Sequence, residues 1–114
     1  MTRPDLSIII VTWNGRDDVL RCLDAVENGK PALDLEVILV DNASSDDTVS
    51  AVRSRYPDVR VVENPTNRGF PRANNQGIEI ARGRHVLLLN PDTEVECGTL
   101  RTCVETLDGE PKLG

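Results

Sequence analysis

The sequence is poor in several residue types on which binding sites commonly depend. It holds three aromatic residues, Trp13, Tyr56 and Phe70, and one histidine, His85. So few aromatic rings provide no stacking platform for nucleic-acid bases. The 13 basic residues are outnumbered by 19 acidic ones, which gives a net charge of −6. A protein that binds nucleic acid through its phosphates needs a basic face, so we expect no nucleic-acid partner.

Cysteine is also scarce. Cys22, Cys97 and Cys103 are odd in number and form no C-x-x-C pair, and each falls within a helical pattern. We therefore expect buried free thiols in a reducing compartment. The first residues, MTRPD, hold no apolar signal core, and no apolar run approaches the length of a membrane-spanning helix. These absences predict a cytoplasmic protein and give no indication of membrane contact.

Two common phosphate-binding motifs are missing. No G-x-G-x-x-G follows the first apolar run, which speaks against a dinucleotide-binding fold and most methyltransferases. No G-x-x-x-x-G-K-[ST] occurs either, which excludes a P-loop. A diphosphate bound by this chain would need another source of positive charge, and a divalent cation on a carboxylate together with an arginine would supply it.

What the chain does contain is a regular alternation of apolar runs and amphipathic segments. Its 114 residues are 39% hydrophobic and 28% charged, which is typical of one soluble globular domain, and we expect residues 1–114 to form it. Apolar runs predict four strands, with a helix after each. The predicted strands are Leu6–Val11, Leu35–Val40, Val59–Glu63 and Arg84–Leu89. This order predicts a Rossmann-like α/β fold with a mainly parallel sheet.

Local signals predict where the elements begin and end. Ser44 with Asp47 three residues later fits a capping box that would start the second helix. Pro71 suits the first position of the third helix, and Gly83 is placed as its C-terminal cap. The run Val86–Leu89 shows no polar alternation, so we expect a strand buried on both faces.

Polar side chains follow the carboxyl ends of all four predicted strands. They are Asn14, Asp41 and Asn42, Asn64, and Asn90 with Asp92. Parallel strands bring their carboxyl ends to one edge, where open α/β sheets bind ligands, so we expect these side chains to line one crevice. The residues alone leave a second interpretation of Asp92 and Thr93, in which they only cap the helix that follows.

Three segments in this order resemble glycosyltransferases of family 2 with the GT-A fold, in particular the nucleotide-sugar-binding half of rhamnosyltransferase-like members. They are IIIVTWN, EVILVDNASSDDT and ENPTNRGFPRANNQGIEIARGRHVLLLNPDTEV. The resemblance covers nearly the whole chain, from Leu6 to Leu107. It implies a GT-A half domain, and together with the alternating pattern it predicts the strand order 3-2-1-4.

The resemblance also implies a site for a nucleoside-diphosphate sugar. Its expected nucleotide-binding residues are Thr12, Trp13, Asn14, Asp41, Asn42, Asn67, Arg68, Asn90 and Asp92. Asp41 would contact the base or ribose, the loop of Asn67 to Phe70 would bring Arg68 within reach, and Asp92 would bind Mg²⁺ or Mn²⁺ with the diphosphate. The sequence departs from the family's D-x-D motif at Asn90, so metal affinity should rest mainly on Asp92.

Members of this family continue with an acceptor site and a carboxylate base, and neither is expected after Leu107. We therefore assign no catalytic residue, because Glu94 and Glu96 are better explained as partners of a helix dipole. Two functions stay open: the donor half of an inverting glycosyltransferase, and a non-catalytic nucleotide-binding or interaction module with the same fold. We expect either a fragment or a natural half domain, whose uncovered sheet edge predicts self-association.

Overall fold

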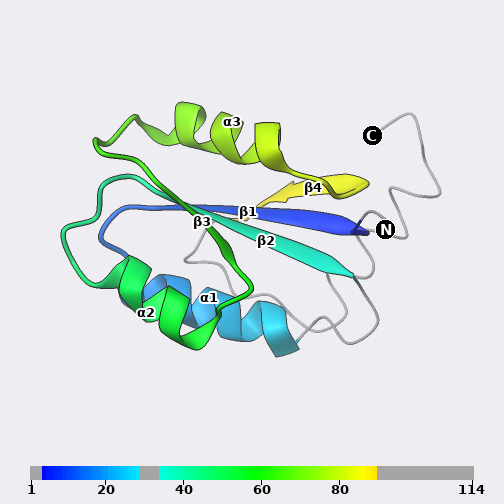
Figure 1. The fold of residues 1–114 in the computed structure, drawn as a ribbon, viewed down its shortest axis with the longest axis horizontal. Helices are drawn as coiled ribbons and strands as arrows, with labels where there is room; N and C mark the ends of the chain where they lie inside the picture. The colour runs from blue at the N-terminus through cyan, green and yellow to red at the C-terminus, as the bar shows by residue number, and fades with distance from the viewer. Residues whose placement is uncertain (1–3, 29–33, 90–114) are drawn as a thin grey trace.

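The computed structural model describes residues 4–28 and 34–89, which form a four-stranded parallel sheet with helices on both faces (Figure 1). The elements are β1 (Leu6–Thr12), α1 (Arg16–Asn28), β2 (Leu35–Asp41), α2 (Thr48–Arg55), β3 (Arg60–Glu63), α3 (Phe70–Ile80) and β4 (His85–Leu88). The strand order is β3-β2-β1-β4, with every neighbouring pair parallel. This confirms the predicted fold class and strand order. The predicted fourth helix, with Cys97 and Cys103, lies outside the described residues.

Two apolar layers enclose the sheet. Alternation along β1 sends Ile8 and Ile10 toward α1 and α2, and sends Ile9 and Val11 toward α3. All seven residues of β1 are buried, because this strand is covered on both faces and paired along both edges. Cys22 of α1 is a free thiol in the first layer, as predicted, and burial raises its pKa to about 11.

Helix α3 approaches β1 closely at Gly77. A Cβ on Gly77 would lie 2.5 Å from Cγ2 of Ile9, which is fully buried. The helix therefore packs at a distance that only a glycine permits at this position. Phe70 rather than Pro71 begins α3, so Pro71 is its second residue and stays within the first turn.

Gly83 does not cap α3, contrary to the prediction. The helix ends at Ile80, with Ala81 in the capping position. Gly83 packs against β1 instead, where its amide donates to Ser7 Oγ at 2.8 Å and a Cβ would lie 2.5 Å from Ser7 N. A glycine is needed at position 83 because the backbone there lies against β1, a strand more than seventy residues earlier in the sequence.

The capping-box prediction for α2 is also wrong. Asp47 occupies the N-cap position without a side-chain hydrogen bond to the helix. Asp46 supplies the side-chain hydrogen bond to the helix start instead, because its Oδ1 accepts from Thr48 N at 3.1 Å and from Thr48 Oγ1. The bond from the Thr48 hydroxyl is the main reason that the pKa of Asp46 lies below its usual value.

Strand β4 is not buried on both faces, contrary to the prediction. Val86 and Leu88 are 40% and 50% exposed. They lie beside Ser7 and Ile9 of β1, and therefore on the α3 side of the sheet. Because α3 packs over β1 and β2, its cover does not reach these two side chains at the edge. The other face of β4 does pack, through Leu87, against the layer under α1.

Candidate functional site

The carboxyl ends of β1, β2 and β3 bring predicted site residues together. The backbone ladder continues past the strands, because Asn42 N donates to Thr12 O and Asn64 N donates to Asp41 O, each at 2.9 Å. These four residues are each at most 5% exposed. Their polar side chains are therefore held by the sheet itself at the edge where ligands of α/β proteins bind.

Asp41 is oriented by the loop that follows it. Ser44 Oγ donates to Asp41 Oδ1 at 2.6 Å, and Ser44 N donates to Oδ2 at 3.0 Å. This use of Ser44 explains why it does not cap α2. Each carboxylate oxygen keeps acceptor capacity, since it has two lone pairs. Asp41 lines a hollow of about 440 Å³ together with Arg53 and Glu63.

Asn14 joins the turn after β1 to the loop after β2. Its φ of 52° lies in the left-handed region, which asparagine enters more readily than most residues. Its Oδ1 accepts from Ser45 N at 2.7 Å and from Asp46 N at 3.4 Å, while its backbone N donates to Ser44 Oγ at 2.8 Å. Ser44 and Ser45 thus belong to the site, although the sequence predicted only a capping role for Ser44 and no role for Ser45.

A second network lies beneath the turn that carries Arg68. Asn42 Oδ1 accepts from Asn64 Nδ2 at 2.9 Å and from Arg68 N at 3.4 Å, and Asn42 Nδ2 donates to Gly69 O at 3.3 Å. Asn64 and Gln76 exchange two further hydrogen bonds, each of 2.8 Å. The sequence predicted Asn64 at this edge but indicated no role for it. Gln76 lies in a segment that carries the family resemblance, but no role could be predicted for it, because only the packing of α3 decides which residue it meets.

Four side chains at this edge are open to solvent. Asn67 and Arg68 are exposed, and Trp13 and Phe70 are 60% and 53% exposed. Asn67 Oδ1 accepts from Gly69 N at 2.9 Å, and Gly69 has a φ of 83°, so a tight turn presents the Arg68 side chain. The same edge thus carries an exposed guanidinium, an exposed indole ring and an oriented carboxylate.

The described residues contain no cluster of three candidate metal ligands. Asn90 and Asp92 lie outside them, so their predicted roles are untested. Within residues 4–28 and 34–89, no three histidine, cysteine, aspartate or glutamate side chains lie close enough together to hold a metal ion. The assignment of a metal ligand therefore stays a prediction about Asp92.

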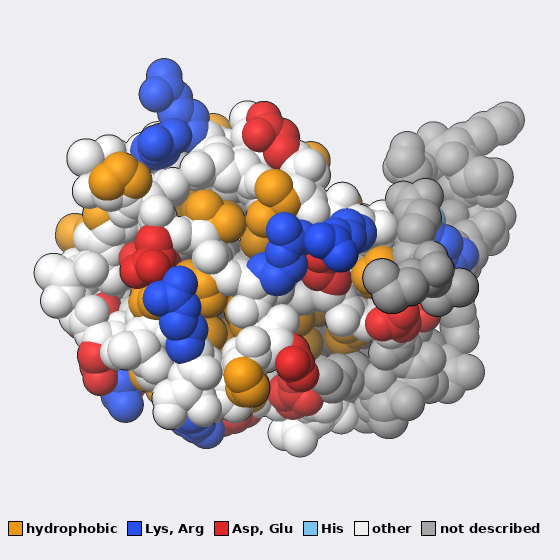
Figure 2. All heavy atoms as spheres, in the orientation of Figure 1, with side chains coloured by type: hydrophobic (Ala, Val, Ile, Leu, Met, Phe, Trp, Pro, Cys, Tyr) orange, Lys and Arg blue, Asp and Glu red, His pale blue; other side chains and the backbone are white. Residues whose placement is uncertain are grey.

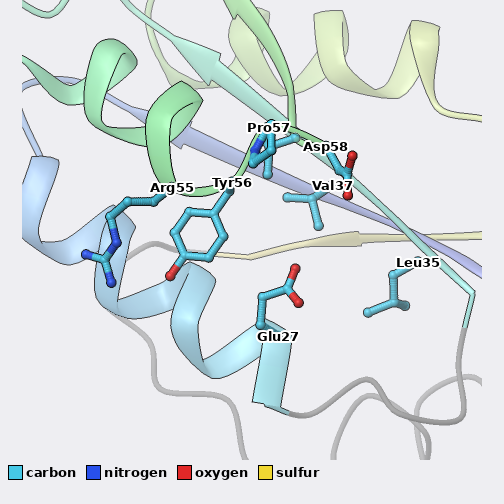
Figure 3. Close-up of a pocket in the computed structure, with 8 residues that line it drawn as sticks. Glu27, Leu35, Val37, Arg55, Tyr56, Pro57 and Asp58 are labelled. Carbon is cyan, nitrogen blue, oxygen red and sulfur yellow. The ribbon is translucent and has the colours of Figure 1, made fainter.

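A separate cavity of about 330 Å³ lies at the other end of the strands (Figure 3). It is lined by Leu35 and Val37 of β2, Glu27 of α1, and Tyr56 and Asp58 in the α2–β3 connection. Figure 3 shows it beside α1, with the Glu27 carboxylate near the Tyr56 ring. None of the predicted nucleotide-binding residues lines it. The candidate site is therefore the carboxyl edge and not this cavity.

The surface carries charges of both signs. Figure 2 shows basic and acidic side chains interspersed on one face, where no extended basic surface is seen. Several arginines pair with carboxylates, among them Arg53 with Glu63 and Arg55 with Asp24. Among the described residues, no helix is long and apolar enough to span a membrane.

Comparison with known proteins identifies the family. The sequence profile described as "Glycosyl transferase family 2" matches residues 7–114. The chain belongs to glycosyl transferase family 2. Among curated relatives, it is 32% identical over 106 residues to succinoglycan biosynthesis protein ExoO of Rhizobium meliloti. The aligned region covers 92% of this chain and 30% of that protein. The chain is 36% identical over 92 residues to a poly(ribitol-phosphate) beta-glucosyltransferase of Bacillus spizizenii, covering 76% and 14% respectively.

Two solved structures share the fold. Mannosyltransferase PcManGT from Pyrobaculum calidifontis, in complex with GDP-Man and Mn²⁺, matches with a TM-score of 0.82 and 32% identity over 94% of this chain and 33% of that one. Staphylococcus aureus TarS 1–349 in complex with UDP matches with a TM-score of 0.83 and 26% identity, over 92% and 32%. The chain thus has the GT-A fold and spans about a third or less of these four proteins.

Proposed function

We propose that this chain is the donor-binding part of an inverting glycosyltransferase, which binds a nucleoside-diphosphate sugar with a divalent cation. The observation that carries the proposal is the carboxylate of Asp41. It is buried at the carboxyl end of β2, is oriented by two bonds from Ser44, and lines a hollow of about 440 Å³. That volume lies within the range of small-molecule sites. Two structurally similar proteins were solved with GDP-Man and Mn²⁺ and with UDP, which supports this ligand class.

The residues at the edge take distinct roles in this proposal. Thr12, Trp13 and Asn14 form the side of the nucleoside site that follows β1. Asp41 accepts hydrogen bonds from the ribose or base, since a carboxylate is a pure acceptor. Arg68 offers a planar fork of donors suited to a phosphate. Mg²⁺ or Mn²⁺ on Asp92 would neutralise charge on the departing diphosphate.

Binding of the donor is separable from transfer of the sugar. Transfer needs an acceptor oxygen held in line and a base within hydrogen-bond reach, which typically supplies ~10²–10⁴-fold of the rate. The proposed site residues hold the donor only, so we expect residues 1–114 to act as a donor-binding domain without glycosylating an acceptor. The proposal includes a cytoplasmic location, where a thiol such as Cys22 stays reduced. Robust acceptor glycosylation by the purified chain would show that a base is present.

Calorimetry on the purified chain tests the proposal directly. UDP, GDP and dTDP are titrated with and without Mn²⁺, because the base specificity is open. We expect at least one to bind, and to bind more tightly with the metal. Failure of all three would favour the alternative, a non-catalytic interaction module with the same fold.

Substitution of Asp92 tests the metal site. In the Asp92→Asn variant we expect the metal dependence of diphosphate binding to disappear, while binding of the nucleoside stays nearly unchanged, because only the diphosphate shares the cation. Asp58→Asn is the matched control, since Asp58 is exposed and lines the cavity at the other end of the strands. Equal diphosphate affinity of the unsubstituted chain with and without metal would mean that Asp92 is only a helix cap.

A further inference from the structure

We propose that Asn64 and Gln76 are positioning residues, which act through Asn42 to hold the turn of Asn67 to Phe70 so that Arg68 meets the diphosphate. We call this segment the Arg68 turn. The inference rests on the proposed function and deepens it, because it assigns roles to two side chains that need not touch the ligand. It also gives Asn42 an indirect role in place of a direct contact.

Asn64 is fixed from two directions. Its backbone N donates to Asp41 O at 2.9 Å, which ties it to the end of β2. Its side chain pairs reciprocally with Gln76 of α3, through two bonds of 2.8 Å. The remaining Nδ2 proton is thereby aimed at Asn42 Oδ1, 2.9 Å away. Asn64 is only 5% exposed, and a buried amide must keep its partners, so the network favours one arrangement.

Asn42 transfers this order to the Arg68 turn. Its Oδ1 accepts from Arg68 N at 3.4 Å, and its Nδ2 donates to Gly69 O at 3.3 Å. Two bonds from one amide to adjacent residues fix the direction of the backbone at the point where the Arg68 side chain leaves it. Asn42 is itself 3% exposed, with both ends of its amide engaged in these contacts.

Packing does not hold the Arg68 turn at its tightest point. A Cβ built on Gly69 would meet no atom within 4 Å, and both Arg68 and Phe70 are exposed. The hydrogen bonds from Asn42 therefore supply order that side-chain packing does not. An arginine must be held in a defined direction to contact a phosphate with two donors. A turn that is ordered before the ligand arrives loses less entropy on binding, and this increases the affinity for the diphosphate.

The Gln76→Leu variant tests the inference, because leucine is similar in size and removes both bonds to Asn64. Asn75→Leu is the matched control, since Asn75 is the neighbouring residue of α3 and is exposed. The probe is the tightest of UDP, GDP and dTDP with Mn²⁺, compared with its own free nucleoside. For Gln76→Leu we expect affinity for the diphosphate to fall about tenfold and affinity for the nucleoside to change less than about twofold. The control should change neither.

A double-mutant cycle with Arg68→Ala distinguishes a positioning role of Gln76 from a general loss of structure in the variant. If Gln76 acts through Arg68, Gln76→Leu should cost less than about twofold in a chain that already carries Arg68→Ala. Equal losses of nucleoside and diphosphate affinity, or additive losses in the cycle, would overturn the inference and leave the proposed function intact. If the unsubstituted chain bound none of the three diphosphates, the proposed function would fail, and the role of the turn in diphosphate binding with it.

Hydrogen exchange tests the network without any ligand. Gln76→Leu should speed exchange of the Arg68 and Gly69 amides relative to the unsubstituted chain and to Asn75→Leu, because the Arg68 amide donates to Asn42. Unchanged exchange at these two amides would overturn the positioning role even if nucleotide binding were altered.

Discussion

At the scale of single residues, Asp41 shows how burial and orientation combine in one side chain. It is 3% exposed, and Ser44 holds both of its oxygens. A donor group on a ribose or base would therefore find an acceptor whose direction is already set, and little ordering entropy would be lost on binding.

Removing this carboxylate should weaken nucleoside binding. For Asp41→Ala we expect a loss of about 1–3 kcal/mol, the cost of deleting a buried hydrogen-bond partner, whether or not metal is present. Calorimetry with the free nucleoside measures the change. Asp58→Ala, an exposed aspartate away from this edge, is the control. Unchanged nucleoside affinity in Asp41→Ala would reject the role of Asp41.

Glu36 predicts how stability depends on pH. Burial raises the pKa of Glu36, but hydrogen bonds from Arg82 N, Ser7 Oγ and Arg60 together lower the pKa below its usual value. A carboxylate whose pKa is lowered by folding contributes stability that is complete above its ordinary pKa of 4.5 and is lost as the pH falls through the folded value.

The Glu36→Gln variant tests this linkage. Its unfolding free energy should fall less steeply on the acid side than that of the unsubstituted chain, because glutamine does not titrate. Urea unfolding between about pH 7 and about pH 3 measures both slopes. Glu79→Gln, at an exposed position of α3, is the control. Identical acid slopes for the unsubstituted chain and Glu36→Gln would contradict the prediction.

At the scale of elements, the contact between α3 and β1 predicts the effect of a single methyl group. Gly→Ala usually stabilises a helix by about 0.5–1 kcal/mol. In Gly77→Ala the new Cβ would lie 2.5 Å from Ile9 Cγ2, in a layer without space to give way. We expect net destabilisation by about 1–3 kcal/mol, measured by urea unfolding. Asn75→Ala, on the exposed side of the helix, should be neutral or stabilising. A more stable Gly77→Ala variant would show that α3 can shift.

The sequence predicted the existence and order of the described elements, and it failed where a residue had a choice of partners. Ser44 looked like a helix cap, but Asp41 and Asn14 engage it. Gly83 looked like a cap, but Ser7 needs its close approach. Val86 and Leu88 belong to an apolar run that a sheet could bury on both faces. They are exposed because α3 does not cover this part of the sheet. The role of Gln76 depends on the same packing.

At the scale of the whole molecule, the motifs and the alternating pattern were enough to predict the family, the fold and the edge where polar residues meet. The family, the fold and this edge all depend on the order of motifs and apolar runs along the chain, which can be read directly from the sequence. The link from Gln76 through Asn64 to Asn42 depends on the angle at which α3 crosses the sheet. No spacing in the sequence encodes that angle, so this half of the candidate site came from the structure.

The edge at β4 predicts the behaviour of the chain at high concentration. Val86 and Leu88 present apolar side chains on an edge strand, a combination that favours pairing with another copy. We expect the mass measured by light scattering to rise with concentration, and Leu88→Lys to reduce that rise. Ser50→Lys, which adds the same charge at an exposed position of α2, is the control. A constant monomer mass at high concentration would contradict the prediction.

The strand order also has a consequence for folding during synthesis on the ribosome. β1 ends at Thr12, but the partner on its second edge, β4, begins only at His85. At synthesis rates of about 5–20 residues per second, roughly 4–15 s separate the two. Until then the nascent chain can pair β1 with β2 alone. The most deeply buried strand of the finished protein therefore spends its first seconds as an exposed edge, when a chaperone has most to protect.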